Sequence, residues 1–362
     1  MPPTDTTAVP PPPRAAPPPR LGPARPRPLQ FALFLAAMAW YLCARALALS
    51  ASRGLALRFD LGDSAAQPLL EAAALLFLIV LGFALLRAIE RRRAPLRLTL
   101  GLPQRATSRA EWTLGAAIGW GLAIASVLPM ALARALNVRL WTAPRAFELL
   151  GLSLLTLAIA TLANALALYG YGFQRLIEAI GPVRATLLLA LLAALARALN
   201  PAYGTRLAPR VLVEVLASVL LALCWLRTHG LWLLWGLHFA WAASTAALFG
   251  LPLGGTTEFA SVIDTRAAGP LWLTGGDYGP GAALLSIFLL LAAIPILVRA
   301  TSDYAWSYTH PPLIPAGYDV TIPPPAAHAA MEQAAAQPVN PGSLVQILPA
   351  TPRSPVAGTP PE

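Results

Sequence analysis

The chain has 362 residues, of which 57% are hydrophobic and 12% charged, and its mean hydropathy is +0.62. This is about half the charged fraction of an ordinary soluble domain and predicts a polytopic membrane protein. The net charge of +10 comes from 26 arginines without a lysine, which excludes Schiff-base lysine chemistry, Ser-Lys dyads and Walker-type phosphate loops.

The chain opens with a Pro/Arg-rich arm, residues 1–28, whose composition predicts disorder. Residues 29–300 form the expected transmembrane domain, because windows of about 20 apolar residues mark membrane helices. Residues 301–362 are a Pro/Ala-rich tail that we also expect to be disordered. We therefore predict an all-α fold, a bundle of about eight transmembrane helices at Leu29–Leu49, Pro68–Ala88, Trp112–Ala135, Phe147–Tyr169, Val183–Leu199, Arg210–Leu226, Leu231–Leu251 and Ala282–Val298.

Arginines in the predicted loops indicate an orientation. The N-terminal arm, the loop that opens with Arg91–Arg93 and the loop containing Arg175 and Arg184 all fall on one side if the helices alternate. The positive-inside rule then predicts a multi-pass protein of the plasma (inner) membrane with both termini in the cytoplasm. Arginine lies at the ends of apolar runs, so we expect the lipid bilayer and not nucleic acid as its partner.

The usual motifs of intramembrane catalysis are missing from the sequence. HExxH and GxSxG do not occur, which leaves zincin-type and serine-nucleophile sites without support. Glu71, Glu148 and Glu214 each stand alone on a predicted helix, whereas two-carboxylate or Glu/His catalysis needs convergent groups. His238 is the ionisable residue near the middle of Leu231–Leu251, and such a residue is a functional-site candidate.

Two stretches of the sequence have recognisable motifs: Asn164–Pro201 contains YGYGFQRL, and a second stretch contains GLWLLWGLHFAW around His238. Both resemble the CPBP (CAAX-protease and bacteriocin-processing, or Abi) family of intramembrane metalloproteases. WLTGG and YGP, at Trp272–Gly276 and Tyr278–Pro280, are also similar to the family. The resemblance covers about residues 160–285, and it implies an eight-helix fold with EExxxR, FxxxH and HxxxN or HxxxD motifs.

Most motif residues of that family are replaced in this chain. The paired glutamates correspond to Asn164 and Ala165, the motif arginine to Tyr169, the phenylalanine to Ala193, the second histidine to Arg197 and the final asparagine to Ala242; His238 alone is retained. The resemblance implies that a glutamate activates water while histidines bind a metal or stabilise the oxyanion. An amide has no useful basicity, arginine repels a divalent cation, and catalytic zinc takes about three protein ligands.

These replacements predict a catalytically inactive member of the family, a pseudoprotease that acts as a membrane scaffold or binds a membrane protein or peptide partner. An active intramembrane metalloendopeptidase with its glutamate relocated to Glu148, Glu178 or Glu214 is the alternative, and a transporter component is the second. We expect no cofactor; zinc or another divalent metal would be needed only by the active alternative.

Six residues have structural interpretations beside the functional ones. Arg197 and Glu214 lie about one turn from a short interhelical loop, so we expect a structural ion pair that offsets the cost of a charge in hydrocarbon, with Asn164 and His238 as polar neighbours. Gly115 and Gly119 form a GxxxG pattern that predicts close helix packing.

Overall fold

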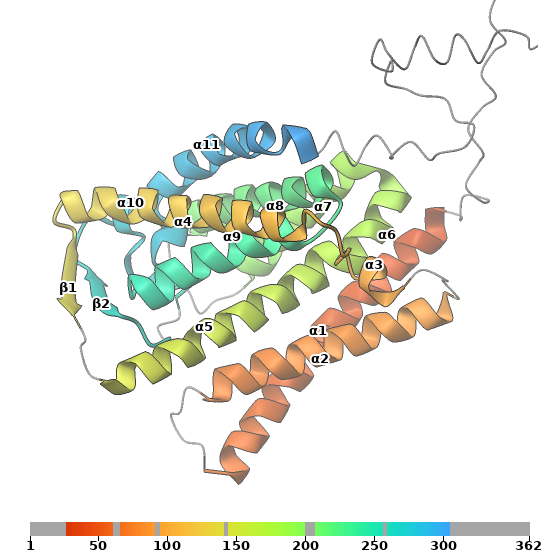
Figure 1. Ribbon diagram of the computed structural model, residues 1–362, viewed down its shortest axis with the longest axis horizontal. Coiled ribbons are helices and arrows are strands. Elements are labelled where there is room, and N and C mark those ends of the chain that lie inside the picture. The colour runs from red at the N-terminus through yellow and green to blue at the C-terminus, as the bar shows by residue number, and fades with distance from the viewer. Residues whose placement is uncertain are drawn as a thin grey trace, which may run out of the picture. The chain divides into compact units, whose positions relative to one another are not determined.

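Helices account for most of the chain in the computed structural model, which describes residues 27–60, 66–90, 95–140, 144–199, 207–255 and 259–304 (Figure 1). The main helices are α1 (Arg27–Arg58), α2 (Ala66–Ile89), α4 (Ser108–Leu132), α5 (Pro144–Ala165), α6 (Tyr171–Ile180), α7 (Pro182–Ala198), α8 (Leu207–Thr228), α9 (Trp232–Ala242) and α11 (Leu284–Ala300). Short turns of helix are α3 (Leu96–Thr99), α10 (Leu271–Thr274), η4 (Gly276–Tyr278) and η5 (Pro280–Ala282). Most of the predicted arm and tail lies outside the described residues.

Five helices are long and apolar enough to cross a membrane: Arg27–Arg58, Ala66–Ile89, Ser108–Leu132, Phe147–Ile180 and Ala208–Thr228. Each of the three other predicted spans is also helical, but α7, α9 and α11 have only 17, 11 and 17 residues. The count of eight spans therefore stays a prediction, while a mostly helical membrane protein is shown. Successive turns of α7 and its C-cap residue expose a stripe of large apolar side chains, Val183, Leu187, Leu191, Leu195 and Leu199.

The fold differs from the all-α prediction in one element. The strands β1 (Leu136–Leu140) and β2 (Ile263–Ala267) pair antiparallel, with Leu136 opposite Ala267 and Leu140 opposite Ile263. α4 accordingly ends at Leu132, three residues before the predicted end, because Arg134 takes a left-handed φ of 50° and directs the chain into β1. The sheet lies beyond the helix ends (Figure 1).

The fourth predicted helix is longer than its apolar run suggests. α5 continues through the π-helical turn η1 (Leu166–Gly170) directly into α6, so the helical segment reaches Ile180 and not Tyr169. Gly181 then adopts φ 86° and Pro182 starts α7. A π-turn inside an α-helix is uncommon and often accompanies a functional site. A second π-turn, η3 (Ala243–Leu248), follows α9.

Glycines bring α4 and α9 into direct backbone contact, as the GxxxG pattern predicted. A Cβ placed on Gly115 would lie 2.1 Å from the Leu233 carbonyl oxygen, and one on Gly119 would lie 2.2 Å from that of Leu237. Across the same interface, a Cβ on Gly236 would lie 2.2 Å from the Trp112 carbonyl oxygen. This contact fixes the depth and rotation of α9, the helix that carries His238.

The helix ends gather into two groups, which we call the α3 end and the strand end. Side chains join the start of α1, the end of α2 and α6 at the α3 end, where Arg175 on α6 donates to Gln30 on α1 and Tyr171 donates to Glu90 after α2. The loop before α4 and the ends of α8 and α11 belong to the same group, because Arg105 bonds Thr228 and Arg227 bonds Thr301. The opposite helix ends form the strand end, where the end of α4 and the start of α5 connect to β1, and β2 follows η3 (Figure 1).

Candidate functional site

The α5 residues that the resemblance aligned with a pair of glutamates have structural contacts. The Tyr41 hydroxyl on α1 donates to Asn164 Oδ1 at 3.1 Å, which ties α5 to the N-terminal helix. Ala165 is buried, and Tyr169, within η1, donates its hydroxyl to the Ser218 carbonyl on α8 at 3.3 Å. The amide and phenol therefore act as bridges between helices.

Arg197, which the resemblance aligned with a histidine, is in an ion pair. Its Nη2 and Nε lie 3.0 and 3.3 Å from Glu214 Oε2, and each side chain is about a third exposed, 29% and 31%. Arg210 donates to the Arg197 carbonyl at 3.3 Å. The two guanidinium carbons lie 5.9 and 5.0 Å from the Tyr278 ring centroid, within cation–π range.

The loop before α11 positions Tyr278 by means of glycine. Gly279 has φ 85°, and a Cβ there would lie 1.9 Å from the Pro252 carbonyl oxygen. The neighbouring turn also has Gly275 at φ 72°, the left-handed region that favours glycine. The TGG and YGP stretches that carried part of the family resemblance thus hold an aromatic ring over the Arg197–Glu214 pair.

Substitution of the pair tests whether the two charges are coupled. Arg197→Ala and Glu214→Ala should each lower stability, and the double variant should recover about 0.5–1 kcal/mol relative to the sum, because residues in contact couple and both are partly exposed. Unfolding in detergent, followed by circular dichroism, measures the effect. Arg197→Ala combined with Glu148→Ala, which removes an exposed carboxylate without an ion pair in the described residues, should be additive; equal additivity in both cycles would show that the pair is not coupled.

His238 on α9 is the histidine on which the resemblance to the CPBP family rested, and it is partly buried. Within the described ranges, no hydrogen bond to its imidazole is found. Thr245 in η3, two turns further along the same face, has a buried Oγ1 that also lacks a hydrogen-bond partner in the described structure. Ala242 is fully buried against Leu157 of α5 and contributes only packing.

The sequence-predicted site residues therefore do not assemble into one polar group. Asn164 contacts α1, Arg197 contacts α8, and no described hydrogen bond joins either of them to His238. This corrects the expectation that Asn164 and His238 would join the Arg197–Glu214 pair: the Asn164 amide oxygen accepts from Tyr41. In the described part of the chain, no cluster of three or more His, Cys, Asp or Glu side chains could hold a metal ion.

The three candidate relocated glutamates have separate surroundings. Glu214 is held by Arg197, and Glu178 Oε2 accepts from Arg175 Nη1 at 2.8 Å at the α3 end. Glu148 is exposed near the start of α5, at the strand end. No described contact brings any of these carboxylates to His238, so the general base that the active alternative needs is not found beside it.

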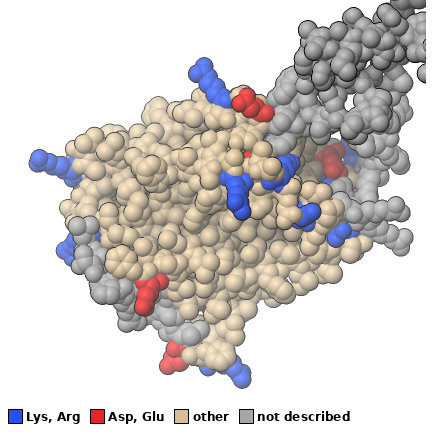
Figure 2. Space-filling view, in the orientation of Figure 1, with Lys and Arg blue, Asp and Glu red and all other residues tan. Residues whose placement is uncertain are grey.

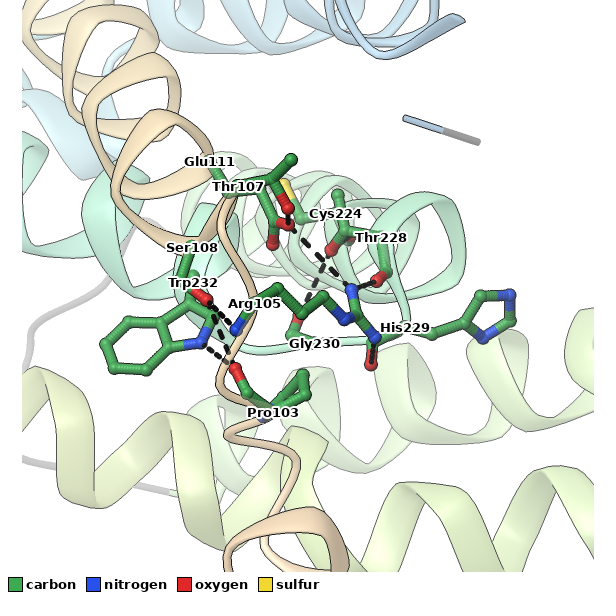
Figure 3. A network of polar contacts seen from close by, with 10 residues as sticks. All are labelled: Pro103, Arg105, Thr107, Ser108, Glu111, Cys224, Thr228, His229, Gly230 and Trp232. Carbon is green, nitrogen blue, oxygen red and sulfur yellow. Dashed lines mark hydrogen bonds and ion pairs between the residues drawn. The ribbon is translucent and has the colours of Figure 1, made fainter. Parts of the chain in front are cut away.

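Two polar networks at the α3 end were missed by the sequence analysis. Figure 3 shows the first, in which Arg105 donates to the Thr228 and His229 carbonyls at 2.6 and 3.2 Å and lies 3.8 Å from the fully buried Glu111. The Thr107 hydroxyl donates to Glu111 at 2.8 Å. Partial burial, together with the Arg105 cation, lowers the pKa of His229.

The hydrogen bonds of this first network hold the turn that leads into α9. Besides the Arg105 contacts, Trp232 Nε1 donates to the Pro103 carbonyl at 2.8 Å (Figure 3). The Leu231 backbone N–H donates to the Gly101 carbonyl. The loop before α4 thus holds both sides of the turn at Gly230. Ser108 followed three residues later by Glu111, the S-x-x-E pattern typical of a helix start, was the available signal in the sequence.

The second network is centred on Arg175, which is completely buried. Its Nη1 lies 2.8 Å from Glu178, 3.0 Å from Gln30 and 3.5 Å from Glu90, and its guanidinium lies over the Tyr171 ring. Arg175 was interpreted from sequence as a loop arginine, and the structure places it inside the helical bundle instead. The reason is that η1 continues the helix past Tyr169 and brings Arg175 against α1 and α2.

Comparison with known proteins gives no relative. No family model, no curated protein and no solved structure matches this chain.

Proposed function

We propose that this chain is a non-catalytic integral membrane protein with a CPBP-like helical bundle, a pseudoprotease that binds a membrane protein or peptide partner. The observation that carries the proposal is the state of the three family positions: His238 has no carboxylate in described contact, Asn164 bridges α5 to α1, and Arg197 is in an ion pair with Glu214. One imidazole supplies neither a water-activating base pair nor a metal site of about three ligands.

The elements around these positions fit a binding role better than a catalytic one. The π-turns η1 and η3 adjoin the family-like positions on α5 and α9, and the glycine contacts between α4 and α9 keep the helix of His238 fixed. These features give a rigid local shape that does not depend on reactive side chains. A protein that only binds a partner needs such a fixed surface but needs neither a general base nor a metal.

The proposal predicts that the purified protein has no peptidase activity. Incubation with a prenylated CAAX peptide or a leader peptide should give no cleavage above the buffer rate under conditions in which an active CPBP protease cleaves it, because general-base catalysis alone contributes about 10²–10⁴-fold. Mass spectrometry of the peptides measures this. Cleavage that His238→Ala or a chelator abolishes would contradict the pseudoprotease proposal and support the relocated active site.

We further propose eight membrane spans with the α3 end in the cytoplasm. Nine described arginines lie at that end, and only four acidic residues accompany them; the arginines are Arg27, Arg87, Arg97, Arg105, Arg109, Arg175, Arg184, Arg227 and Arg299, and the acids Glu90, Glu111, Glu178 and Asp303. Such an excess favours the cytoplasmic side.

Reporter fusions test this topology. Fusions in the Arg91–Arg93 loop and in the tail after residue 304 should both report the cytoplasm, because eight alternating spans return the chain to the side on which it began. A fusion after Asp60 should report the opposite side and is the internal control. A tail fusion on the same side as the Asp60 fusion would show that one of the three short helices does not cross.

A further inference from the structure

The described charges are distributed differently at the two ends of the bundle. At the α3 end the three glutamates form ion pairs with buried or partly buried arginines. Arg175 pairs with Glu90 and Glu178, and Arg105 pairs with Glu111. Asp303 is the acidic residue without an ion pair among the described ones there. The exposed surface of this end therefore presents arginine with little compensating negative charge.

Five exposed arginines at this end form no described ion pair, and we call them the arginine rim: Arg27, Arg97, Arg109, Arg184 and Arg299. Arg97 donates to the neutral amide of Gln104. Their guanidinium groups stay charged at every physiological pH. On the right of Figure 2, arginine side chains gather on the side where α3 lies in Figure 1, and a broad uncharged surface separates them from the charges at the left and lower margins.

The strand end has as many exposed arginines without an ion pair but a different balance. Arg53, Arg58, Arg134, Arg139 and Arg266 are accompanied by four acidic residues that form no ion pair in the described structure, Asp60, Glu71, Glu148 and Asp277. Positive and negative groups are thus interspersed at this end. Among the groups without a described ion pair, the α3 end has five arginines and one acidic residue, an excess of four positive charges. The strand end has five arginines and four acidic residues, an excess of one.

Three arginines of the rim adjoin exposed apolar side chains near the helix ends. Arg97 adjoins Leu98, which is 46% exposed, and Arg184 adjoins Val183, which is 70% exposed. Arg299 follows Val298 and the exposed Ile296 at the end of α11. A guanidinium next to an apolar side chain that faces lipid lies at the depth of the phospholipid headgroups.

We propose that the arginine rim binds the headgroups of anionic phospholipids in the leaflet that surrounds the α3 end. Charge complementarity and the headgroup depth of Arg97, Arg184 and Arg299 carry this proposal, which is independent of the proposed scaffold function. Arginine pairs with phosphate through two parallel hydrogen bonds, so the interaction selects negatively charged lipid over zwitterionic lipid.

The test uses the full chain in neutral detergent, with phosphatidylglycerol and phosphatidylcholine as probes and native mass spectrometry as the readout. The rim variant is Arg97→Gln/Arg184→Gln/Arg299→Gln. The matched control is Arg58→Gln/Arg134→Gln/Arg139→Gln, three exposed arginines at the strand end that lie within two residues of exposed apolar side chains.

We expect the wild-type protein to retain phosphatidylglycerol in preference to phosphatidylcholine. The rim variant should weaken phosphatidylglycerol binding at least tenfold, since each arginine near an anionic surface contributes about fivefold. The control variant should change it by less than about threefold, because its arginines lie among free carboxylates. Raising the salt concentration should reduce the wild-type preference, as expected of exposed charges.

Several results would overturn the proposal. They are equal retention of the two lipids by the wild-type protein, equal losses in the two triple variants, or displacement of phosphatidylglycerol by a soluble polyglutamate peptide at low concentration, which would identify the rim as a protein-docking surface. If the rim variant does not fold, as judged by circular dichroism, the single variants Arg184→Gln and Arg139→Gln make the same comparison.

Discussion

Alanine at Gly119 or Gly236 is expected to destabilise the bundle by about 1–3 kcal/mol or more, the range for overpacking a close contact. A Cβ at either position would lie 2.2 Å from a backbone carbonyl oxygen of the partner helix, so α4 and α9 would have to separate. A backbone carbonyl cannot move aside as easily as the end of a flexible side chain, so the clash is not relieved locally. Detergent unfolding followed by circular dichroism measures the loss.

Gly121→Ala is the matched control for this prediction. Gly121 lies two residues further along α4, and its added Cβ would have nothing within 4 Å. Alanine there should be neutral or stabilising by up to about 1 kcal/mol, because glycine is the poorer helix former. A loss at Gly121 equal to that at Gly119 would mean that helix propensity, and not the α4–α9 contact, determines the effect.

The glycine contact illustrates what the sequence could predict. The spacing of Gly115 and Gly119 on an apolar helix indicated a close-packed face, because small residues at that interval let backbones approach. The sequence did not predict which helix packs against Gly115 and Gly119, since Gly236 belongs to a segment more than a hundred residues away. Helix positions follow from local hydropathy, whereas helix pairing depends on the whole bundle.

In the candidate site, too, local sequence predicted some contacts and not those that depend on which helices pair. Loop length placed Arg197 and Glu214 at similar depth, and the structure has them 3.0 Å apart. Asn164 was expected beside them, but its partner Tyr41 lies on α1, and no local pattern connects those two residues. Nor could the ring of Tyr278 be placed over Arg197, since it depends on how a glycine turn meets Pro252.

Arg175 is the residue whose surroundings were least accessible from the sequence. Apolar windows ended the fourth helix at Tyr169 and put Arg175 in a cytoplasmic loop, where an arginine is ordinary. A π-turn carries no hydropathy signal, because it depends on backbone bonding and leaves the composition of the helix unchanged. The continuous helix buries Arg175 beside the buried Glu90 and the partly exposed Glu178. The contribution of this group to stability can be measured.

Removal of the Arg175 side chain is expected to have the largest effect among the charged residues. Arg175→Ala should cost about 3–5 kcal/mol, because breaking a buried pair by removing one partner leaves an uncompensated charge, here the carboxylate of Glu90 at 3% exposure. The same change also removes the bond to Gln30 and the contact with the Tyr171 ring. The docking of α1 and α2 on α6 should weaken first, which cysteine accessibility at the α1–α6 contact can measure beside global unfolding.

Two further variants separate charge from packing. Arg175→Met/Glu90→Gln keeps much of the volume and removes both charges, so it should recover a large part of the loss, as replacement of a buried ion pair by neutral groups often does. Arg184→Ala, an exposed arginine without a described ion pair, should stay within about 0.5 kcal/mol of the wild-type protein. If Arg175→Ala costs no more than Arg184→Ala, the buried network does not stabilise the bundle, and the continuous α5–α6 helix must be held by its apolar contacts with α1 and α2 alone.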